Sequence, residues 1–310
     1  MLIDFISSRQ GEFAALLTAF FWTITALAFE SASKKVGSLS VNLIRLVAAL
    51  GLLTIFSFII RGIPFPTDAS AHNWIWLSLS GLVGFVLGDL FLFRAYVVVG
   101  ARISMLIMSL APPIAALIGW LTLGEQLNYK QGLGMLLTFI GIALVVLHRE
   151  DKDALQLNGG RRKFKFSYPI TGLLLAFGGA VGQGGGLVLS KYGMGDYNVF
   201  AAVQIRVITG VIGFLALFVI LNRWGALSLA LKNRQAMGRL SIGAFFGPFL
   251  GVSFSLWAVR YTSTGVASAI MSIVPVLIIP ASIYFHKEKL KMKEIIGAII
   301  AIFGVFLFFL

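Results

Sequence analysis

One acidic side chain lies deep within an apolar stretch of this 310-residue chain, and it is the residue best placed to do chemistry. Asp89 stands in the hydrophobic segment 74–98, five residues before Arg94. A charge at the centre of a membrane span costs about 2.5–3.5 kcal/mol on insertion scales, so it needs a function or a partner. Two interpretations stay open: a proton-accepting or cation-binding group in a cavity, or a structural ion pair with Arg94 or Arg45.

Two arginines lie near the starts of apolar stretches in the two halves of the chain. Arg45 and Arg206 are each preceded by isoleucine and followed by hydrophobic residues. Their long side chains can reach back to the membrane surface, or they can anchor an anionic group such as a carboxylate by charge-assisted hydrogen bonds. Glu30 and Lys34, four residues apart, are expected to form a solvated pair at a helix end.

A methionine–serine–proline motif occurs twice. Proline inside a helix removes one backbone hydrogen bond and kinks it, which frees a carbonyl about one turn earlier. Methionine offers a soft surface that suits varied ligands. Ordinary packing of kinked helices is the alternative, but duplication favours a role in lining a cavity. The motif comprises Met108, Ser109 and Pro112 in the first half and Met271, Ser272 and Pro275 in the second.

Gln183 is an amide within a glycine-rich apolar run, 178–186. So many glycines permit close helix approach, and the amide needs a partner that a substrate can supply. The corresponding stretch of the first half carries the bulky Trp22 and Thr25 instead. We therefore expect these residues, with Trp257 as a second aromatic surface, to form the walls of a shared cavity.

Composition indicates an all-α integral membrane protein. The chain is 58% hydrophobic with a mean hydropathy of +0.94, and 12% of its residues are charged, against about 25% in soluble domains. Ten stretches are long and apolar enough to cross about 30 Å of hydrocarbon. They are 12–31, 39–60, 74–98, 102–123, 129–148, 168–189, 199–221, 239–258, 264–285 and 293–310.

The second half of the chain repeats the first at an offset of 163 residues. Each half, 12–148 and 168–310, holds five apolar stretches, and a basic linker, 149–167, joins them. An odd number of helices per half places the two repeats upside down relative to each other, and such inverted repeats typically enclose a substrate site between them. The repeated glycines predicted to form the rocking contact are Gly84, Gly88, Gly247 and Gly251.

Several other classes of function are disfavoured. The net charge of +13 is best explained by basic loops that hold topology against anionic lipid, not by nucleic acid. The chain has no cysteine, and its three histidines lack metal-ligand spacing. No nucleophile motif is present, so we expect no enzyme activity, no metal and no cofactor. The bias of basic residues favours both termini outside the cell.

The motifs resemble those of the EamA branch of the drug/metabolite transporter superfamily. This resemblance implies ten helices around a central cavity, with the fifth and tenth at the periphery and both termini in the cytoplasm, so orientation stays open. The residues that carry it are Ala95, Tyr96, Met108, Ser109, Leu110, Ala111, Pro112, Gly124, Glu125, Gly134 and Gly141, with Ala258, Met271, Ser272, Ile273, Val274, Pro275, Lys287, Glu288, Gly297 and Gly304 in the second copy.

Together these observations predict a multi-pass secondary transporter of the inner (plasma) membrane, with export favoured. Its substrate is expected to be a small organic metabolite such as an amino acid, moved by alternating access between the repeats. The lipid bilayer is the other expected partner, and a monomer is compatible with this interpretation. The alternatives are a lipid-carrier flippase of the same fold and, less favoured, a membrane-embedded enzyme.

Overall fold

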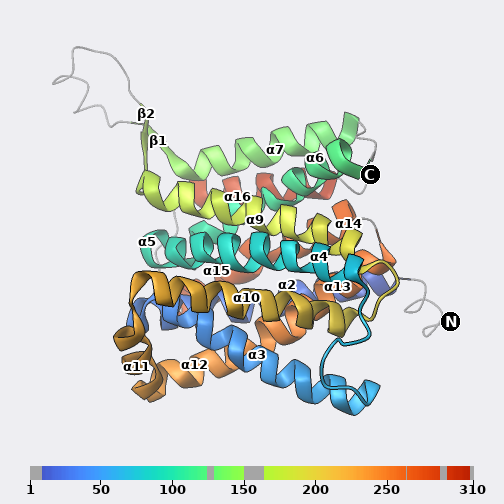
Figure 1. The fold of residues 1–310 in the computed structure, drawn as a ribbon. Coiled ribbons are helices and arrows are strands. Elements are labelled where there is room, and N and C mark those ends of the chain that lie inside the picture. The colour runs from blue at the N-terminus through green and yellow to red at the C-terminus, as the bar shows by residue number, and fades with distance from the viewer. Residues whose placement is uncertain (1–8, 124–128, 150–163, 263, 287–291, 308–310) are drawn as a thin grey trace.

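The protein is a bundle of apolar helices whose axes run in broadly similar directions (Figure 1). The computed structural model describes residues 9–123, 129–149, 164–262, 264–286 and 292–307. The two ends of the chain lie at one end of the bundle (the termini end), and the two short strands lie at the other (the linker end). The two halves therefore each cross the bundle an odd number of times.

Within the described residues, six helical stretches are long and apolar enough to cross a membrane. The third and the sixth are continuous runs of several elements. The stretches are α2 (Gln10–Val36), α3 (Ser38–Arg61), the run from α4 (Ala71–Gly81) to α5 (Asp89–Met108), α9 (Ile170–Met194), α10 (Val199–Leu221), and the run from α12 (Arg234–Ala244) to α13 (Val252–Tyr261).

The other apolar stretches of the sequence form shorter helices. Between α10 and α12 lies α11 (Trp224–Lys232), which is not one of the predicted spans. The shorter helices on the predicted spans are α6 (Ala111–Leu123), α7 (Tyr129–Val146), α14 (Thr264–Met271), α15 (Val274–His286) and α16 (Met292–Phe306).

The predicted proline kinks are complete breaks. One helix ends at Met108 and the next begins at Ala111, and in the second half the same break separates Met271 from Val274. Pro112 and Pro275 each stand second in the new helix, where the missing N–H has no intrahelical acceptor to lose. A further bend within α5 falls at Gly100, whose φ of +79° suits glycine.

The third and the eighth apolar stretch each contain a π-helical segment that the sequence did not predict. These segments, η1 (Leu82–Gly88) and η2 (Phe245–Gly251), lie between α4 and α5 and between α12 and α13. Both bounds differ by 163 residues, so the irregularity is itself repeated. Such π-segments are frequent at functional sites because they displace the side chains that follow.

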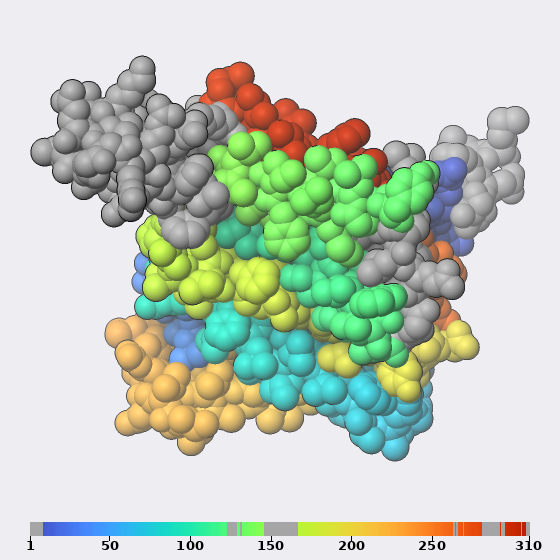
Figure 2. Space-filling view, turned by 90° about the horizontal axis from the view of Figure 1, so that it is seen from above, coloured from blue at the N-terminus to red at the C-terminus, as the bar shows by residue number. Residues whose placement is uncertain are grey.

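Helices α7 and α16 pack side by side along one edge of the molecule (Figure 2). A Cβ atom on Gly304 would lie 2.6 Å from the Thr138 nitrogen, and one on Gly297 would lie 2.6 Å from the Gly141 oxygen. The Thr138 hydroxyl lies 3.3 Å from the Ala301 carbonyl oxygen. Gly141 and Gly304 are 163 residues apart and therefore occupy equivalent positions in the two halves. Each half thus uses the equivalent glycine for this contact.

The fold class has one exception to the all-helical prediction. Strands β1 (Leu147–Arg149) and β2 (Phe164–Phe166) pair in antiparallel register, with His148 opposite Lys165. They bracket the predicted linker. Backbone pairing satisfies the polar groups of the chain where it leaves α7 and returns toward α9.

Filling the contact between α7 and α16 should destabilise the protein. We expect Gly304→Ala to lower the free energy of unfolding by about 1–3 kcal/mol, because the new methyl group overlaps the α7 backbone. The measurement is the thermal unfolding midpoint in detergent. Gly132→Ala is the control, since a Cβ atom there meets nothing within 4 Å. Equal midpoints for both variants would contradict the close packing.

Candidate functional site

Two adjoining hollows lie at the centre of the bundle. Both are lined by Trp22, Met105, Met108 and Gln183, so they form one continuous central cavity. Their volumes are about 30 and 70 Å³, which is room for a few water molecules. The cavity is therefore small in this conformation.

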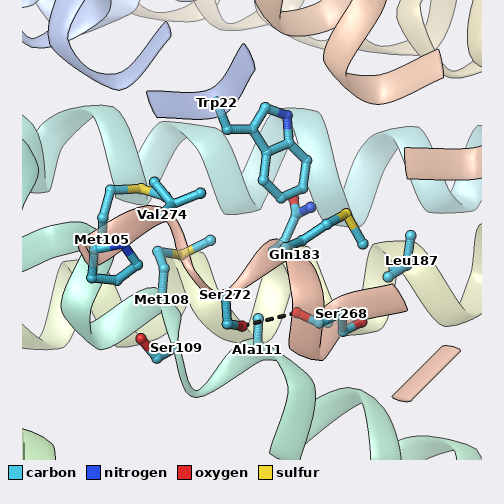
Figure 3. A pocket seen from close by; sticks show the side chains of 13 residues that line it. Trp22, Met105, Met108, Ser109, Ala111, Gln183, Leu187, Ser268, Ser272 and Val274 are labelled. Atoms are coloured by element: carbon cyan, nitrogen blue, oxygen red, sulfur yellow. Dashed lines mark hydrogen bonds between the residues drawn. The ribbon is translucent and has the colours of Figure 1, made fainter. Parts of the chain in front are cut away.

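The first hollow, which we call the methionine hollow, lies where the broken helices meet (Figure 3). The Met271 and Ser272 side chains come from the second break and Met108 and Ser109 from the first. The Ser272 hydroxyl donates to the Ser268 carbonyl oxygen at 2.9 Å. The Ser109 and Ser268 hydroxyls are buried without a hydrogen-bond partner in the described part of the chain, so this hollow offers two free polar groups.

The second hollow, which we call the polar hollow, contains a buried ion pair between Arg45 and Asp89. Their side chains are 4% and 14% exposed. Asn42 links the pair: its amide donates to the Asp89 carbonyl oxygen at 3.2 Å, and its oxygen accepts from Arg45 Nε at 3.0 Å. The guanidinium carbon lies 4.5 Å from the centre of the Phe93 ring, a cation–π distance.

This geometry decides between the partners considered for Asp89. Arg45 pairs with it, whereas Arg94 is exposed on another face. The interpretation that Arg45 reaches back to the membrane surface is wrong, because a carboxylate and aromatic rings hold it inside the bundle. The pair lines the cavity, so a structural role and contact with a ligand are compatible here.

Arg206 is also buried, at 4% exposure, so the same surface interpretation is wrong for it. Its guanidinium carbon lies 4.8 Å from the centre of the Phe85 ring, and its Nε has no hydrogen-bond partner among the described residues. A Cβ atom on Gly84 would lie 3.1 Å from Arg206 Nη2. Asp89 also acts electrostatically on Arg206, although among the described residues its ion pair is with Arg45.

The glycine-rich run of α9 packs directly on η1. Gly182 touches the backbone of Gly88, and a Cβ atom on Gly186 would lie 3.0 Å from Gly84 Cα. Two backbones in contact leave no space, and this side of the cavity is closed. The predicted close approach of the glycine run is thereby confirmed.

The corresponding contact in the other half is made by side chains. A Cβ atom on Gly247 would lie 2.8 Å from Thr25 Cγ2, and one on Gly251 would lie 2.8 Å from the Trp22 ring. These bulky residues of α2 hold η2 away from the α2 backbone, and the polar hollow lies beside them. The two corresponding contacts therefore differ: backbones meet at α9, and side chains meet the π-segment at α2.

The structure brings most of the predicted substrate residues together but not all of them. Trp257 lines neither hollow and stacks on Phe254 at a ring-centre distance of 6.4 Å. Pro112 follows the break and also lines neither. The predicted residues that do line the cavity are Trp22, Thr25, Arg45, Asp89, Met108, Ser109, Gln183, Met271, Ser272 and Pro275.

Sequence reasoning missed the aromatic wall of the polar hollow. Phe29, Phe85, Phe93 and Tyr96 line it, but in the sequence they resemble the many other aromatic residues of apolar stretches. Met105 was also missed, although its spacing of three from Met108 places both on one helix face. That spacing is the signal that was available.

Polar contacts tie the two halves together at the linker end. Arg239 donates to the Ser31 hydroxyl, and Lys35 donates to the side chain of Gln235. The predicted pair of Lys34 and Glu30 is present at 2.5 Å. It is not fully solvated as expected, because Glu30 is 4% exposed.

A second tie joins the halves at the termini end. Asp68 accepts hydrogen bonds from Arg61 at 2.5 Å and from the Tyr197 hydroxyl at 2.8 Å. Partial burial raises the pKa of Asp68, but the two hydrogen bonds lower it by more, so that this pKa lies below its ordinary value. Because the folded-state pKa is lowered, the tie is complete at neutral pH and weakens as the pH falls through that lowered pKa.

Broken apolar helices that meet around a central polar site are the architecture of membrane transporters. The chain belongs to the EamA-like transporter family, whose sequence profile matches residues 9–147 and again residues 170–310. It is similar to YyaM of Bacillus subtilis (strain 168), an uncharacterized transporter, with 24% identity over 243 residues that cover 76% of this chain and 72% of YyaM. A solved crystal structure has the same fold, with a TM-score of 0.62, 16% identity, and coverage of 97% of this chain and 96% of its own.

Replacing one partner of the buried ion pair should lower the free energy of unfolding more than replacing both partners. We expect Asp89→Asn to lower the free energy of unfolding by about 3–5 kcal/mol, because Arg45 is then buried without a counter-charge. Arg45→Met with Asp89→Leu should recover at least half of that loss. Arg206 still lacks a carboxylate in the double variant, which explains an incomplete recovery. Thermal unfolding of the single and double variants measures the coupling, and strictly additive effects would argue against the pair.

Proposed function

We propose that this protein is a secondary transporter that exports small organic metabolites bearing a carboxylate, such as amino acids, by alternating access. The observation that carries the proposal is the Arg45–Asp89 pair on the wall of a small central cavity. A buried pair that also faces a cavity can exchange its internal partner for a ligand. Charges inside a membrane protein commonly mark such a pathway.

The charges of the site favour a substrate with both signs. A zwitterion can place its carboxylate against Arg45 while its ammonium group takes Asp89, so that neither buried charge is left without a partner. Arg206 lines neither hollow but adds a second buried positive charge that acts on Asp89. The rings of Trp22 and Phe93 and the methionines of the other hollow suit an apolar or aromatic side chain.

The proposed architecture is ten membrane spans in two inverted repeats, 12–148 and 168–310, joined by the linker 149–167. Repetition of the helix breaks, of both π-segments and of the α7–α16 glycine contact at one offset supports it. In this arrangement the glycine contacts of Gly84, Gly88, Gly247 and Gly251 are the surfaces on which the halves rock. We place the protein in the inner (plasma) membrane, where it can act as a monomer.

The transport proposal is tested with purified protein in liposomes. We expect saturable flux of one or more radiolabelled amino acids, and Asp89→Asn and Trp22→Phe should each lower it at least tenfold. Trp120→Phe is the matched control, since Trp120 is half exposed on α6 and lines neither hollow. Equal flux in the Trp22 and Trp120 variants would remove the cavity from the pathway.

The alternatives give different results in the same preparation. A lipid-carrier flippase would show no amino-acid flux and would instead be stabilised by a polyprenyl phosphate lipid. A membrane-embedded enzyme would form product in detergent, without any vesicle. Either result would replace the proposed function.

Alternating access predicts that locking either end of the bundle stops transport. The chain has no cysteine, so pairs of cysteines can be introduced without background. One pair replaces Asp68 and Tyr197 at the termini end, and the other replaces Ser31 and Arg239 at the linker end. We expect a short reducible cross-linker to abolish flux at either position, and a reductant to restore it. Single-cysteine variants are the controls, and unchanged flux with both ends locked would overturn the mechanism.

A further inference from the structure

A third hollow, which we call the linker-end groove, lies apart from the central cavity. At about 450 Å³ it is much larger than either central hollow. Its walls include the turn between α2 and α3 and the turn after α10, both at the linker end of the bundle (Figure 1). The central cavity shares none of its residues, so the proposed function assigns it no role.

The charged groups of this groove are all positive. Arg94 and Arg223 are both exposed and both line it, and none of its lining residues is acidic. Neither guanidinium group makes an ion pair or a hydrogen bond with any residue in the ranges that the structure describes. The groove therefore presents two positive charges available to an anion.

The polar end of the groove also offers hydrogen-bond donors. The first turn of α3 lines it, and Gly37 at the N-cap provides no side chain to accept from the free backbone N–H groups. Ser38 and Ser40 are 8% and 2% exposed and line the groove. Their hydroxyls make no hydrogen bond within the described part of the chain. Free amides at a helix start, with buried hydroxyls beside them, are suited to phosphate oxygens.

The rest of the groove is apolar. Leu90 and Phe91 of α5, Leu175 of α9 and Leu221 of α10 line it, and Phe91 and Leu221 are 37% and 52% exposed. These residues belong to membrane-spanning helices, and Arg223 lies two residues after the end of α10. The groove thus has a cationic end at the level of the headgroups and an apolar wall that continues into the hydrocarbon.

We infer that the linker-end groove binds an anionic phospholipid. Its phosphate would lie between Arg94, Arg223 and the start of α3, and an acyl chain would lie along Leu90, Phe91 and Leu221. Basic pockets between spans commonly bind anionic headgroups. A soluble anion would use the cationic end but would leave the apolar wall uncovered, so a lipid fits the whole groove better. The inference rests on the membrane fold and not on the proposed substrate.

The test compares lipids that differ only in headgroup. The full chain in neutral detergent is titrated with phosphatidylglycerol or phosphatidylcholine of the same acyl chains, and the thermal midpoint and native mass spectra are recorded. We expect saturable stabilisation by phosphatidylglycerol only, and Arg94→Gln with Arg223→Gln should weaken that binding about tenfold or more. Lys232→Gln with Arg234→Gln removes the same charge at the same end, outside the groove, and should bind as the native chain does.

A second variant separates binding in the groove from general attraction to a basic surface. Ala226 is exposed and lines the groove, so Ala226→Trp fills it without changing charge and should also weaken phosphatidylglycerol binding. Equal binding of the two lipids would overturn the inference. So would an equal loss of binding in the groove double variant (Arg94 and Arg223) and in the control double variant (Lys232 and Arg234). Stabilisation by inorganic phosphate as strong as by phosphatidylglycerol would also overturn it and would assign a site for soluble anions.

Discussion

The buried pair of Arg45 and Asp89 is the interaction on which the centre of this protein depends. Two charges inside a membrane bundle are tolerated only because they neutralise each other, and because Asn42 and aromatic rings satisfy the remaining polar surface. The side chains around the pair meet this requirement. The rings that enclose it also form the cavity wall, so the element that stabilises the charges is the one that a ligand would meet.

The two halves have the same arrangement of helices, but their side chains differ at the cavity. On the α9 side, glycines bring two backbones into contact, whereas on the α2 side Trp22, Thr25 and Phe29 hold the π-segment away. Identical helices at both places would have given either two closed contacts or two open ones. The difference in side-chain size therefore makes the two halves unequal at the cavity, and the polar hollow is lined on the α2 side by Trp22, Thr25 and Phe29.

Polar contacts also join the two halves at the two ends of the bundle. Arg61, Asp68 and Tyr197 join the halves at the termini end, and Arg239 joins α12 to Ser31 at the linker end. Both ties lie at helix ends, where water can replace a broken hydrogen bond at little cost. Contacts of this kind join the two halves through single polar groups, whereas the glycine contacts inside the bundle bring backbones together.

The sequence by itself determined where the apolar stretches, the repeat and the proline kinks lie, because each depends on local composition: hydrophobic length, a fixed offset, and a proline that cannot donate. That the kinks are complete breaks came from the structure. Most of the substrate residues that the sequence predicted do line the cavity, since polar groups and methionines are conspicuous in apolar stretches. Only the tertiary structure decided that Arg45 and not Arg94 meets Asp89, and that Arg206 is buried. Those pairings join residues 44 or more positions apart, and their geometry depends on how the helices pack. The π-segments and the aromatic wall likewise depended on packing: the repeated glycines marked the places where η1 and η2 lie but not their π-helical geometry, and the aromatic residues of the wall resemble those of other membrane helices.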